Sequence, residues 1–326
     1  MAFLVFDFFF WSQIELLKQV FTFQISFTEF YFQSYSFTTI YFFLPFFSFI
    51  VFLSCNIGRK NNFTLVDKLW SIITFASSVN LIVHDYLVYE SISRKEIYLL
   101  ALLAIWAWHL TVEYIRRGGL EPGHEDHRWP GVKSGKSNIQ LFFFGIAFVA
   151  IWEPLMLVNI TQPVSIILES RDKDAGVSDI FFLFAIAFFI YLERVFDDVQ
   201  QNYQNAKRKY ESLGEVTDEY TQDELERGFC TQGPFGFSRH PNFAAEQYIW
   251  LSLYLWGAYS SGRLINWSAI GTFSFLGFVY ISAVHTEAHS SLKYPQYKLY
   301  QQSVAMLLPL PGYAWIEPVI TKSKNQ

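Results

Sequence analysis

The chain has 326 residues, of which 52% are hydrophobic, 20% are aromatic and only 16% are charged. This composition excludes an ordinary soluble domain and is typical of a membrane protein. The net charge of −5 and the absence of a basic stripe in the sequence argue against a nucleic-acid partner. The two cysteines, Cys55 and Cys230, predict neither a disulfide framework nor a cysteine metal site.

Residues 1–36 are rich in Phe, with interspersed Ser, Gln and Thr. They have neither the basic start nor the small-residue cleavage site of a signal peptide. We therefore expect an N-terminal interfacial helix or an extra membrane span, followed by a single membrane domain over 37–326.

The apolar residues gather in seven windows, each about long enough to cross a hydrocarbon core of roughly 30 Å. The sequence therefore predicts an all-α, polytopic membrane helix bundle of about seven transmembrane helices, with the lipid bilayer as its partner. The predicted spans are 37–55, 69–88, 97–115, 139–160, 179–196, 243–259 and 265–285.

Most Lys and Arg residues fall in four of the connecting segments, 56–62, 116–138, 197–242 and 286–326. Because positive charge favours the cytosolic side of a membrane, these segments are predicted to face the cytosol.

The third predicted span ends in polar residues, among them His109, Glu113 and Tyr114. His109 and Glu113 are four apart and share a helix face. Ionisable groups at this depth either face a cavity or extend to the interface, and both interpretations fit here.

The loop at 123–129 holds His124, Glu125, Asp126 and His127 in a row. Consecutive loop residues seldom converge on one ion, and no HExxH spacing is present, so we predict no metal site.

The fifth span is predicted to end at Glu193, Arg194, Asp197 and Asp198. Carboxylates at a helix C-terminus oppose the helix dipole, so we expect a sugar or an amide donor to stabilise them. Residues 201–232 follow as a charged stretch, which we interpret as a surface lid or linker. We interpret the basic triple Lys207, Arg208 and Lys209 within it as a juxtamembrane or solvated helix face.

The stretch 233–247, GPFGFSRHPNFAAEQ, is a polar turn that leads directly into an apolar segment. Arg239 and His240 offer several N–H donors, which suits an anion. Pro241 fits the first helical position, and Asn242 and Glu246 then share one face. A positively charged interface anchor with a helix cap is the alternative.

The C-terminal region places Glu287, Ser291 and Tyr294 on one helical side, next to Lys293. A short amphipathic helix that returns to the membrane explains this pattern equally well.

Four strings in this order carry a resemblance to a known family. SRHPNF-x-x-E, at 238–246, resembles the signature of the steroid 5-alpha-reductase-like superfamily of membrane reductases, especially its DUF1295 branch (domain of unknown function 1295). VDKLW at 66–70, EDHRW at 125–129 and the Lys-Tyr pattern from Lys293 resemble the same branch. A looser Arg-His-Pro string also occurs in membrane isoprenylcysteine and phospholipid methyltransferases.

The resemblance implies an endoplasmic reticulum enzyme with a cytosol-facing NADPH pocket in its C-terminal half, about 179–311. The reaction would reduce a carbon–carbon double bond conjugated to a carbonyl in a steroid or enoyl lipid. Tyr114 with Glu113 is our candidate catalytic pair for polarising that carbonyl. Asp197 is an equal candidate for the acidic position that we give to Asp198. The predicted cofactor-binding residues are Asp198, Arg239, His240, Asn242, Glu246, Glu287, Lys293 and Tyr294.

Two alternatives remain from the sequence. The first is a membrane methyltransferase that uses S-adenosylmethionine. The second is a non-catalytic lipid-binding protein of the same fold. Phe243 stands where the family more commonly has Tyr, which removes a hydroxyl and keeps the non-catalytic alternative open.

Overall fold

The computed structural model describes residues 2–56, 62–121, 123–126, 128–169 and 176–317. Over these ranges the chain is helical and contains no β-strand, apart from an isolated parallel bridge between Ser238 and Ala305. The predicted all-α class is therefore confirmed. The chain divides into two compact units, unit 1 (Met1–Ala187 and Ile249–Gly277) and unit 2 (Phe188–Tyr248 and Phe278–Gln326).

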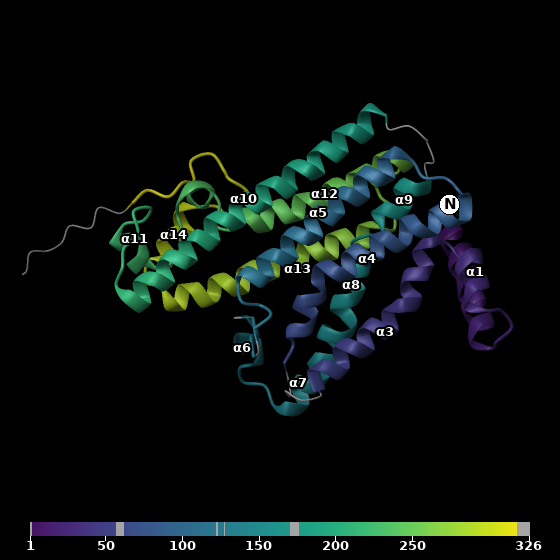
Figure 1. Ribbon diagram of the computed structural model, residues 1–326, viewed down its shortest axis with the longest axis horizontal. Coiled ribbons are helices and arrows are strands. Elements are labelled where there is room, and N and C mark those ends of the chain that lie inside the picture. The colour runs from purple at the N-terminus through teal and green to yellow at the C-terminus, as the bar shows by residue number, and fades with distance from the viewer. Residues whose placement is uncertain (1, 57–61, 122, 127, 170–175, 318–326) are drawn as a thin grey trace, which may run out of the picture. The chain divides into compact units, whose positions relative to one another are not determined.

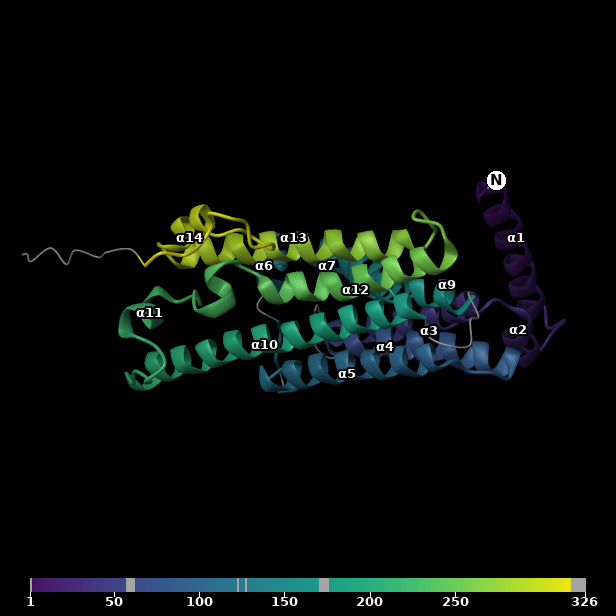
Figure 2. The same ribbon diagram turned by 90° about the horizontal axis from the view of Figure 1, so that it is seen from above.

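Unit 1 is built around α4, which packs against α3, α5 and α8 (Figures 1 and 2). It also contains the start of α10, the end of α12 and the start of α13. The elements that lie wholly within unit 1 are α1 (Ala2–Phe21), α2 (Phe27–Gln33), α3 (Ser36–Asn56), α4 (Thr64–Tyr89), α5 (Arg94–Arg116), α6 (Arg128–Lys133), α7 (Asn138–Phe144), the π-helix η1 (Gly145–Trp152), α8 (Glu153–Asn159) and α9 (Pro163–Glu169).

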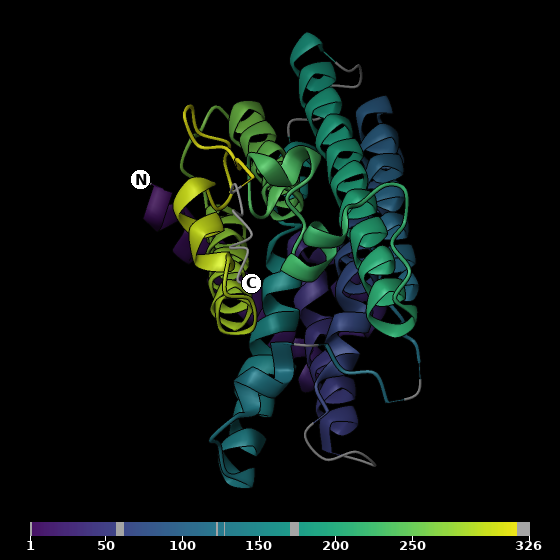
Figure 3. The same cartoon turned by 90° about the vertical axis from the view of Figure 1, so that its left-hand side faces the viewer.

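Unit 2 contains the remaining parts of three long helices and three short elements. Within it, α14 lies against the end of α13 (Figure 3). Its elements are α10 (Val177–Leu213), α11 (Gln222–Arg227), the 3-10 helix η2 (Gly233–Gly236), α12 (Pro241–Ser261), α13 (Ala269–Lys293) and α14 (Tyr297–Ser303), where α10, α12 and α13 are shared with unit 1.

Five segments of the described chain are long and apolar enough to cross a membrane, which is consistent with an integral membrane protein. They are Thr38–Asn56, Thr64–Tyr89, Arg94–Arg116, Asn138–Glu169 and Ala269–Lys293.

The two other predicted spans, 179–196 and 243–259, are helical but are not among these five segments. The first includes Asp179, Glu193 and Arg194, and the second is diluted by Gln, Ser and Tyr residues. That these two helices also cross the membrane stays a prediction.

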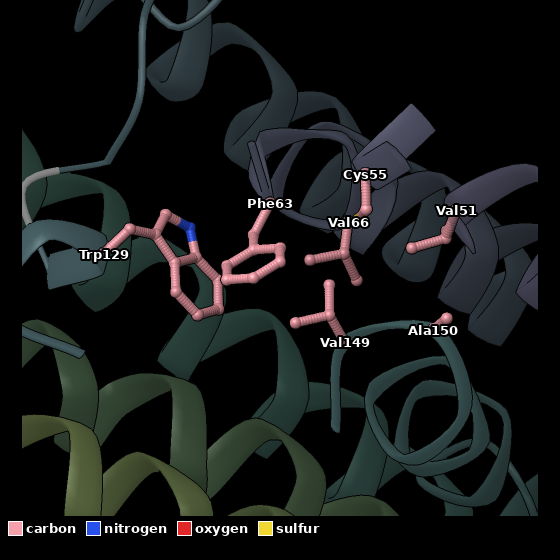
Figure 4. Close-up of a cluster of buried hydrophobic side chains, with 7 residues drawn as sticks. All are labelled: Val51, Cys55, Phe63, Val66, Trp129, Val149 and Ala150. Atoms are coloured by element: carbon pink, nitrogen blue, oxygen red, sulfur yellow. The ribbon is translucent and has the colours of Figure 1, made fainter. Parts of the chain in front are cut away.

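The core of unit 1 joins helices that are distant in sequence. Phe63 and Trp129 meet edge to face, with ring centroids 5.2 Å apart. Aliphatic residues of α3, α4 and η1 complete the cluster (Figure 4). Its buried members are Val51, Cys55, Phe63, Val66, Trp129, Val149 and Ala150.

The π-helix η1 lies between the α-helices α7 and α8 and ends directly before Glu153 and Pro154. Proline has no backbone N–H and its ring crowds the carbonyl one turn earlier, so a wider π-turn accommodates it.

Candidate functional site

The turn that leads into α12 holds the C-terminal segment of unit 2. The backbone N–H groups of Arg239 and His240 donate to the carbonyls of Ala305 and Met306, each at 2.9 Å. The Ser238 hydroxyl adds a bond of 2.7 Å to the Leu307 carbonyl. These bonds fix the position from which the Arg239 and His240 side chains extend.

The Arg239 guanidinium makes four hydrogen bonds inside unit 2. Its Nε and Nη2 donate to the two carboxylate oxygens of Glu287, at 2.6 and 3.0 Å. Its Nη1 donates to the Gln301 carbonyl at 3.0 Å and to the Val304 carbonyl, which satisfies the last turn of α14. An open anion site at Arg239 is therefore too simple an interpretation, because four of its five N–H groups are already used.

Glu287 is the centre of this network, and only 3% of it is exposed. Besides Arg239, it contacts His240 Nε2 at 3.0 Å and accepts a 2.8 Å bond from the Gln301 amide. The His240 ring stacks on Phe243, with centroids 5.3 Å apart. A buried carboxylate with this many partners is well stabilised in its charged form.

Asn242 contacts one of the two candidate aspartates of α10. Its amide donates to Asp197 at 2.9 Å, and Asp197 is buried. Asp198 is partly exposed and lies 3.9 Å from Arg194. The expected amide donor is thus present, although the reason given for it was wrong, because α10 continues to Leu213 and has no C-terminus here.

Tyr294 rests on the backbone of Gly228 and is held there by Lys207. A Cβ added to Gly228 would lie 2.2 Å from the Tyr294 ring, and φ at Gly228 is +87°. Lys207 Nζ donates to the Tyr294 hydroxyl at 2.6 Å and to the Gly228 carbonyl at 2.9 Å. The exposed Lys293 approaches the other side, 5.2 Å from the ring centroid.

The prediction that Lys207 lies on a solvated face was wrong, since the residue is 6% exposed. The sequence contained a signal that this helix face is buried, because Tyr203, Ala206 and Tyr210 recur at helical spacing. The segment 201–232 is also more than a lid or linker, because five of its residues form a buried hydrophobic cluster with Phe235. Its buried members are Tyr203, Ala206, Tyr220, Leu225, Cys230 and Phe235.

Unit 2 also contains an apolar cavity of about 350 Å³ next to the start of α12. Ser238 is its one hydroxyl-bearing wall residue besides Tyr248, and the Ser238 hydroxyl donates to Leu307. The walls are Phe189, Leu192, Phe196, Pro234, Phe237, Ser238, Pro241, Ala244, Ala245, Tyr248, Leu307, Leu308 and Pro309.

A second polar cluster lies in unit 1, where the strings at 66–70 and 125–129 meet. The indole N–H of Trp129 donates to Asp67 at 2.8 Å. Arg128 binds Asp126 through Nε at 2.7 Å and lies 3.8 Å from Asp67. Burial would lower the pKa of Arg128, but Asp126 and Asp67 outweigh it and raise that pKa.

Of the acidic and histidine residues at 124–127, those that the structure describes contact neighbouring protein groups. Glu125 binds Lys133, and Asp126 binds Arg128. The carbonyl of His124 accepts a bond from Thr64, at 3.1 Å, while His127 lies outside the described residues.

Glu113 and Tyr114, the predicted catalytic pair, have different surroundings. Glu113 is bound by Arg116 and Arg117, each at 3.1 Å. The Tyr114 ring lies on Gly119, where an added Cβ would be 2.1 Å away, and its hydroxyl is buried with no hydrogen-bond partner in the described part of the chain. Tyr114 therefore has an unused donor, whereas Glu113 is committed to an ion pair.

Glu153 completes the cluster of unit 1 and was missed by the sequence analysis. It is 2% exposed, and Asp67 and Arg128 act on it electrostatically. A lone carboxylate within the apolar segment 139–160 was the available signal, since intramembrane ionisable groups are rare and functional.

Comparisons with known proteins identify the family. The family model described as "Protein of unknown function (DUF1295)" matches residues 54–304. The chain belongs to the DUF1295 family. It is also 33% identical over 307 residues to a Schizosaccharomyces pombe protein named "Uncharacterized protein C594.04c", which covers 93% of this chain and 88% of the relative. No solved structure matches.

The DUF1295 match confirms the family branch predicted from the four strings, while the link to steroid reductases stays a prediction. Two of these strings, 66–70 and 125–129, form the cluster of unit 1. The other two, at 238–246 and from Lys293, belong to unit 2. Each unit of this DUF1295 protein therefore has its own polar site.

Proposed function

We propose that this DUF1295 protein is a membrane-bound reductase that uses NADPH to reduce a carbon–carbon double bond conjugated to a carbonyl in a hydrophobic substrate. The observation that supports it most is that residues distant in sequence meet in unit 2. Arg239 and His240 meet Glu287, and Asn242 meets Asp197. All of these belong to the set that the reductase resemblance selects, except Asp197, which is the alternative to Asp198.

The donor set of unit 2 fits a nicotinamide dinucleotide in its chemistry. Asn242 and the buried Glu246 offer an amide and a carboxylate for a carboxamide, and the partly exposed Asp198 offers acceptors for ribose hydroxyls. Exposed Lys293 is a cation for phosphate, and Arg239 retains one N–H. When bound, NADPH supplies a hydride.

The ion pair with Glu287 gives Arg239 a positioning role in this proposal. It orients the turn before α12 and fixes the last turn of α14, so that Asn242 and His240 are presented from a rigid support. Tyr294 is supported in the same way by Lys207 and Gly228.

The substrate class is supported by the apolar cavity of about 350 Å³ in unit 2. Its volume is at the lower end of the range for small-molecule sites, about 300–1,000 Å³. Its walls are dominated by aromatic, aliphatic and proline side chains such as Phe196, Pro241 and Leu307, so it suits the hydrocarbon part of a ligand.

Tyr114 is the proposed group for the carbonyl. Negative charge develops on the carbonyl oxygen as the conjugated bond is reduced, and a positioned O–H donor stabilises it. The Tyr114 hydroxyl is buried without a partner among the described residues, so it can donate to a ligand without breaking an existing bond. Glu113 then orients the end of α5 through Arg116 and Arg117.

The distribution of basic residues supports a cytosolic side for the loops that carry 125–129 and 238–242. The reductase resemblance supports the endoplasmic reticulum as the compartment. We include both in the proposal.

The first test measures ligand-dependent stabilisation of detergent-purified protein by NADPH, NADH and S-adenosylmethionine. NADPH at a hundredfold excess over its dissociation constant should raise the free energy of unfolding by roughly 2.7 kcal/mol. Asn242→Ala should reduce this gain, whereas His289→Ala, at an exposed position of α13, should leave it unchanged.

The same protein is then incubated with NADPH and a panel of hydrophobic enones, and the product masses are recorded. A gain of two hydrogens supports the reductase. Stabilisation by S-adenosylmethionine and a gain of one methyl group would indicate the methyltransferase alternative, and no stabilisation by any of the three would indicate a non-catalytic protein.

A further inference from the structure

The polar cluster of unit 1 has more acidic groups than its cation can neutralise. Asp126, Asp67 and Glu153 all act on the single guanidinium of Arg128. Asp126 is the main partner of this guanidinium, because it accepts hydrogen bonds from Arg128 Nε at 2.7 Å and from Nη2 at 3.2 Å. It also accepts from the backbone N–H of Arg128 at 2.9 Å. With all three acids ionised, the cluster would carry two negative charges in excess.

Asp67 has its own stabilising partner. Trp129 donates to it at 2.8 Å, and Arg128 lies at 3.8 Å, so a carboxylate at Asp67 is bound by one N–H and faces one cation. The same indole also packs on Phe63, which fixes it in the core. The excess charge therefore falls on Glu153.

Glu153 has the least support for a negative charge. It is 2% exposed, and its Oε2 is buried with no hydrogen-bond partner in the part of the chain that is described. A buried, unsolvated carboxylate is costly, and Asp67 adds like-charge repulsion.

Among the described residues, Arg128 is the cation that acts on Glu153. On α4, which packs against α8, Asp67 acts on Glu153, whereas Lys68 lines a separate pocket with Thr64 and Glu121. The helix α3 contributes the titratable Cys55, which is also buried. Arg128 comes from α6, and the next cation, Lys133, is bound by Glu125.

We infer that Glu153 is a proton-binding site within the membrane-spanning part of unit 1, where the carboxyl group is neutral and its proton is exchangeable. The ligand of the site is a proton. A neutral acid removes one of the two excess charges and gives the cluster an O–H donor. The π-helix before Glu153 and the missing N–H of Pro154 break the regular α-helical hydrogen bonding next to Glu153, where the proton has to exchange.

The test is infrared spectroscopy of the protein in lipid nanodiscs at pH 7, comparing the wild type with Glu153→Gln. The wild type should show a carboxylic acid C=O band that shifts in heavy water, and the variant should lack it. Glu113→Gln is the matched control, because Glu113 is equally buried but held by two arginines. It should lose a carboxylate band and keep the acid band.

Two outcomes would overturn the inference. One is loss of a carboxylate band in Glu153→Gln with the acid band unchanged, which would make Glu153 a charged partner of Arg128. The other is failure of Glu153→Gln to fold, because glutamine is nearly isosteric with a neutral acid and should be tolerated. Neither result depends on NADPH binding, so these experiments test the proton site independently of the proposed function.

Discussion

Two buried carboxyl groups, Glu287 in unit 2 and Glu153 in unit 1, have opposite surroundings. Glu287 contacts Arg239, His240 and Gln301, and both of its oxygens are used. Glu153 has an oxygen with no hydrogen-bond partner among the described residues. The two groups are nearly equally buried, at 3% and 2% exposed, so burial alone does not decide the role of either.

This difference distinguishes polar groups that hold the structure in place from polar groups that can take part in a reaction. A satisfied polar network holds its members in one geometry and has few donors left for a ligand. A buried polar atom without a partner keeps its hydrogen-bonding capacity for a substrate, a water or a proton. By this criterion the Arg239–Glu287 pair is the scaffold of unit 2, and Tyr114 and Glu153 are the groups that we propose as reactive in unit 1.

The largest effect is expected from removing one member of the scaffold. Glu287→Ala leaves the buried Arg239 guanidinium without its carboxylate, and breaking a buried pair in this way costs about 3–5 kcal/mol. The free energy of unfolding in detergent should fall by this amount. His289→Ala, at an exposed position of the same helix, should have almost no effect.

A double variant tests whether charge is the cause. Arg239→Met with Glu287→Leu removes both charges, and it should be more stable than Glu287→Ala alone. If Glu287→Ala is as stable as the wild type, the network is not the scaffold of unit 2.

A smaller effect is expected at two tyrosine hydroxyls. The Tyr300 hydroxyl donates to the Phe235 carbonyl at 2.5 Å, whereas the buried Tyr114 hydroxyl has no partner among the described residues. Tyr300→Phe should destabilise the protein by about 1–3 kcal/mol, because it strands a buried carbonyl. Tyr114→Phe should change stability by less than about 0.5 kcal/mol.

Denaturant unfolding of both variants measures this difference, and the enone assay supplies a second readout. Tyr114→Phe should lose enone reduction while keeping its stability. Equal destabilisation by the two substitutions would mean that Tyr114 is a structural residue, and the distinction between the units would fail.

The helices and the family were predictable from the sequence. Apolar runs of about 20 residues predict membrane helices because the bilayer sets their length, and five of the predicted spans correspond to candidate spans whose boundaries differ from the prediction by one to nine residues. The turn before Pro241 was also predictable, since proline suits the first helical position and α12 begins there.

The partners of the polar residues were not predictable. Arg239 and Glu287 are 48 positions apart, and Asp67 and Trp129 are 62 apart, so their pairing depends on how the helices pack. Hydrophobic periodicity places a residue on a helix face but does not say which helix covers that face. Lys207 shows the limit, because a lysine in a run of charges is buried only when a group such as Tyr294 accepts from it.

The smallest effect concerns pH. Burial of Glu224 opposes its ionisation, but hydrogen bonds from Thr221 and Gln232 outweigh burial and hold the pKa of Glu224 below its usual value. Because this pKa is lower in the folded protein, its stabilising contribution is present above the unfolded pKa of about 4.3 and is lost as pH falls through the folded value. Glu224→Gln should therefore reduce the loss of stability between about pH 5 and pH 3, by no more than the roughly 1 kcal/mol typical of a helix cap. Glu153→Gln should have the opposite effect. A carboxyl that is already neutral in the folded protein takes up its proton in the unfolded chain between about pH 5 and pH 3, so its removal should make the loss of stability on acidification larger. Unfolding midpoints of the three proteins across this range measure the difference. An acid response that Glu153→Gln reduces as much as Glu224→Gln would show that Glu153 is ionised at neutral pH, in the same way as the carboxylates of unit 2.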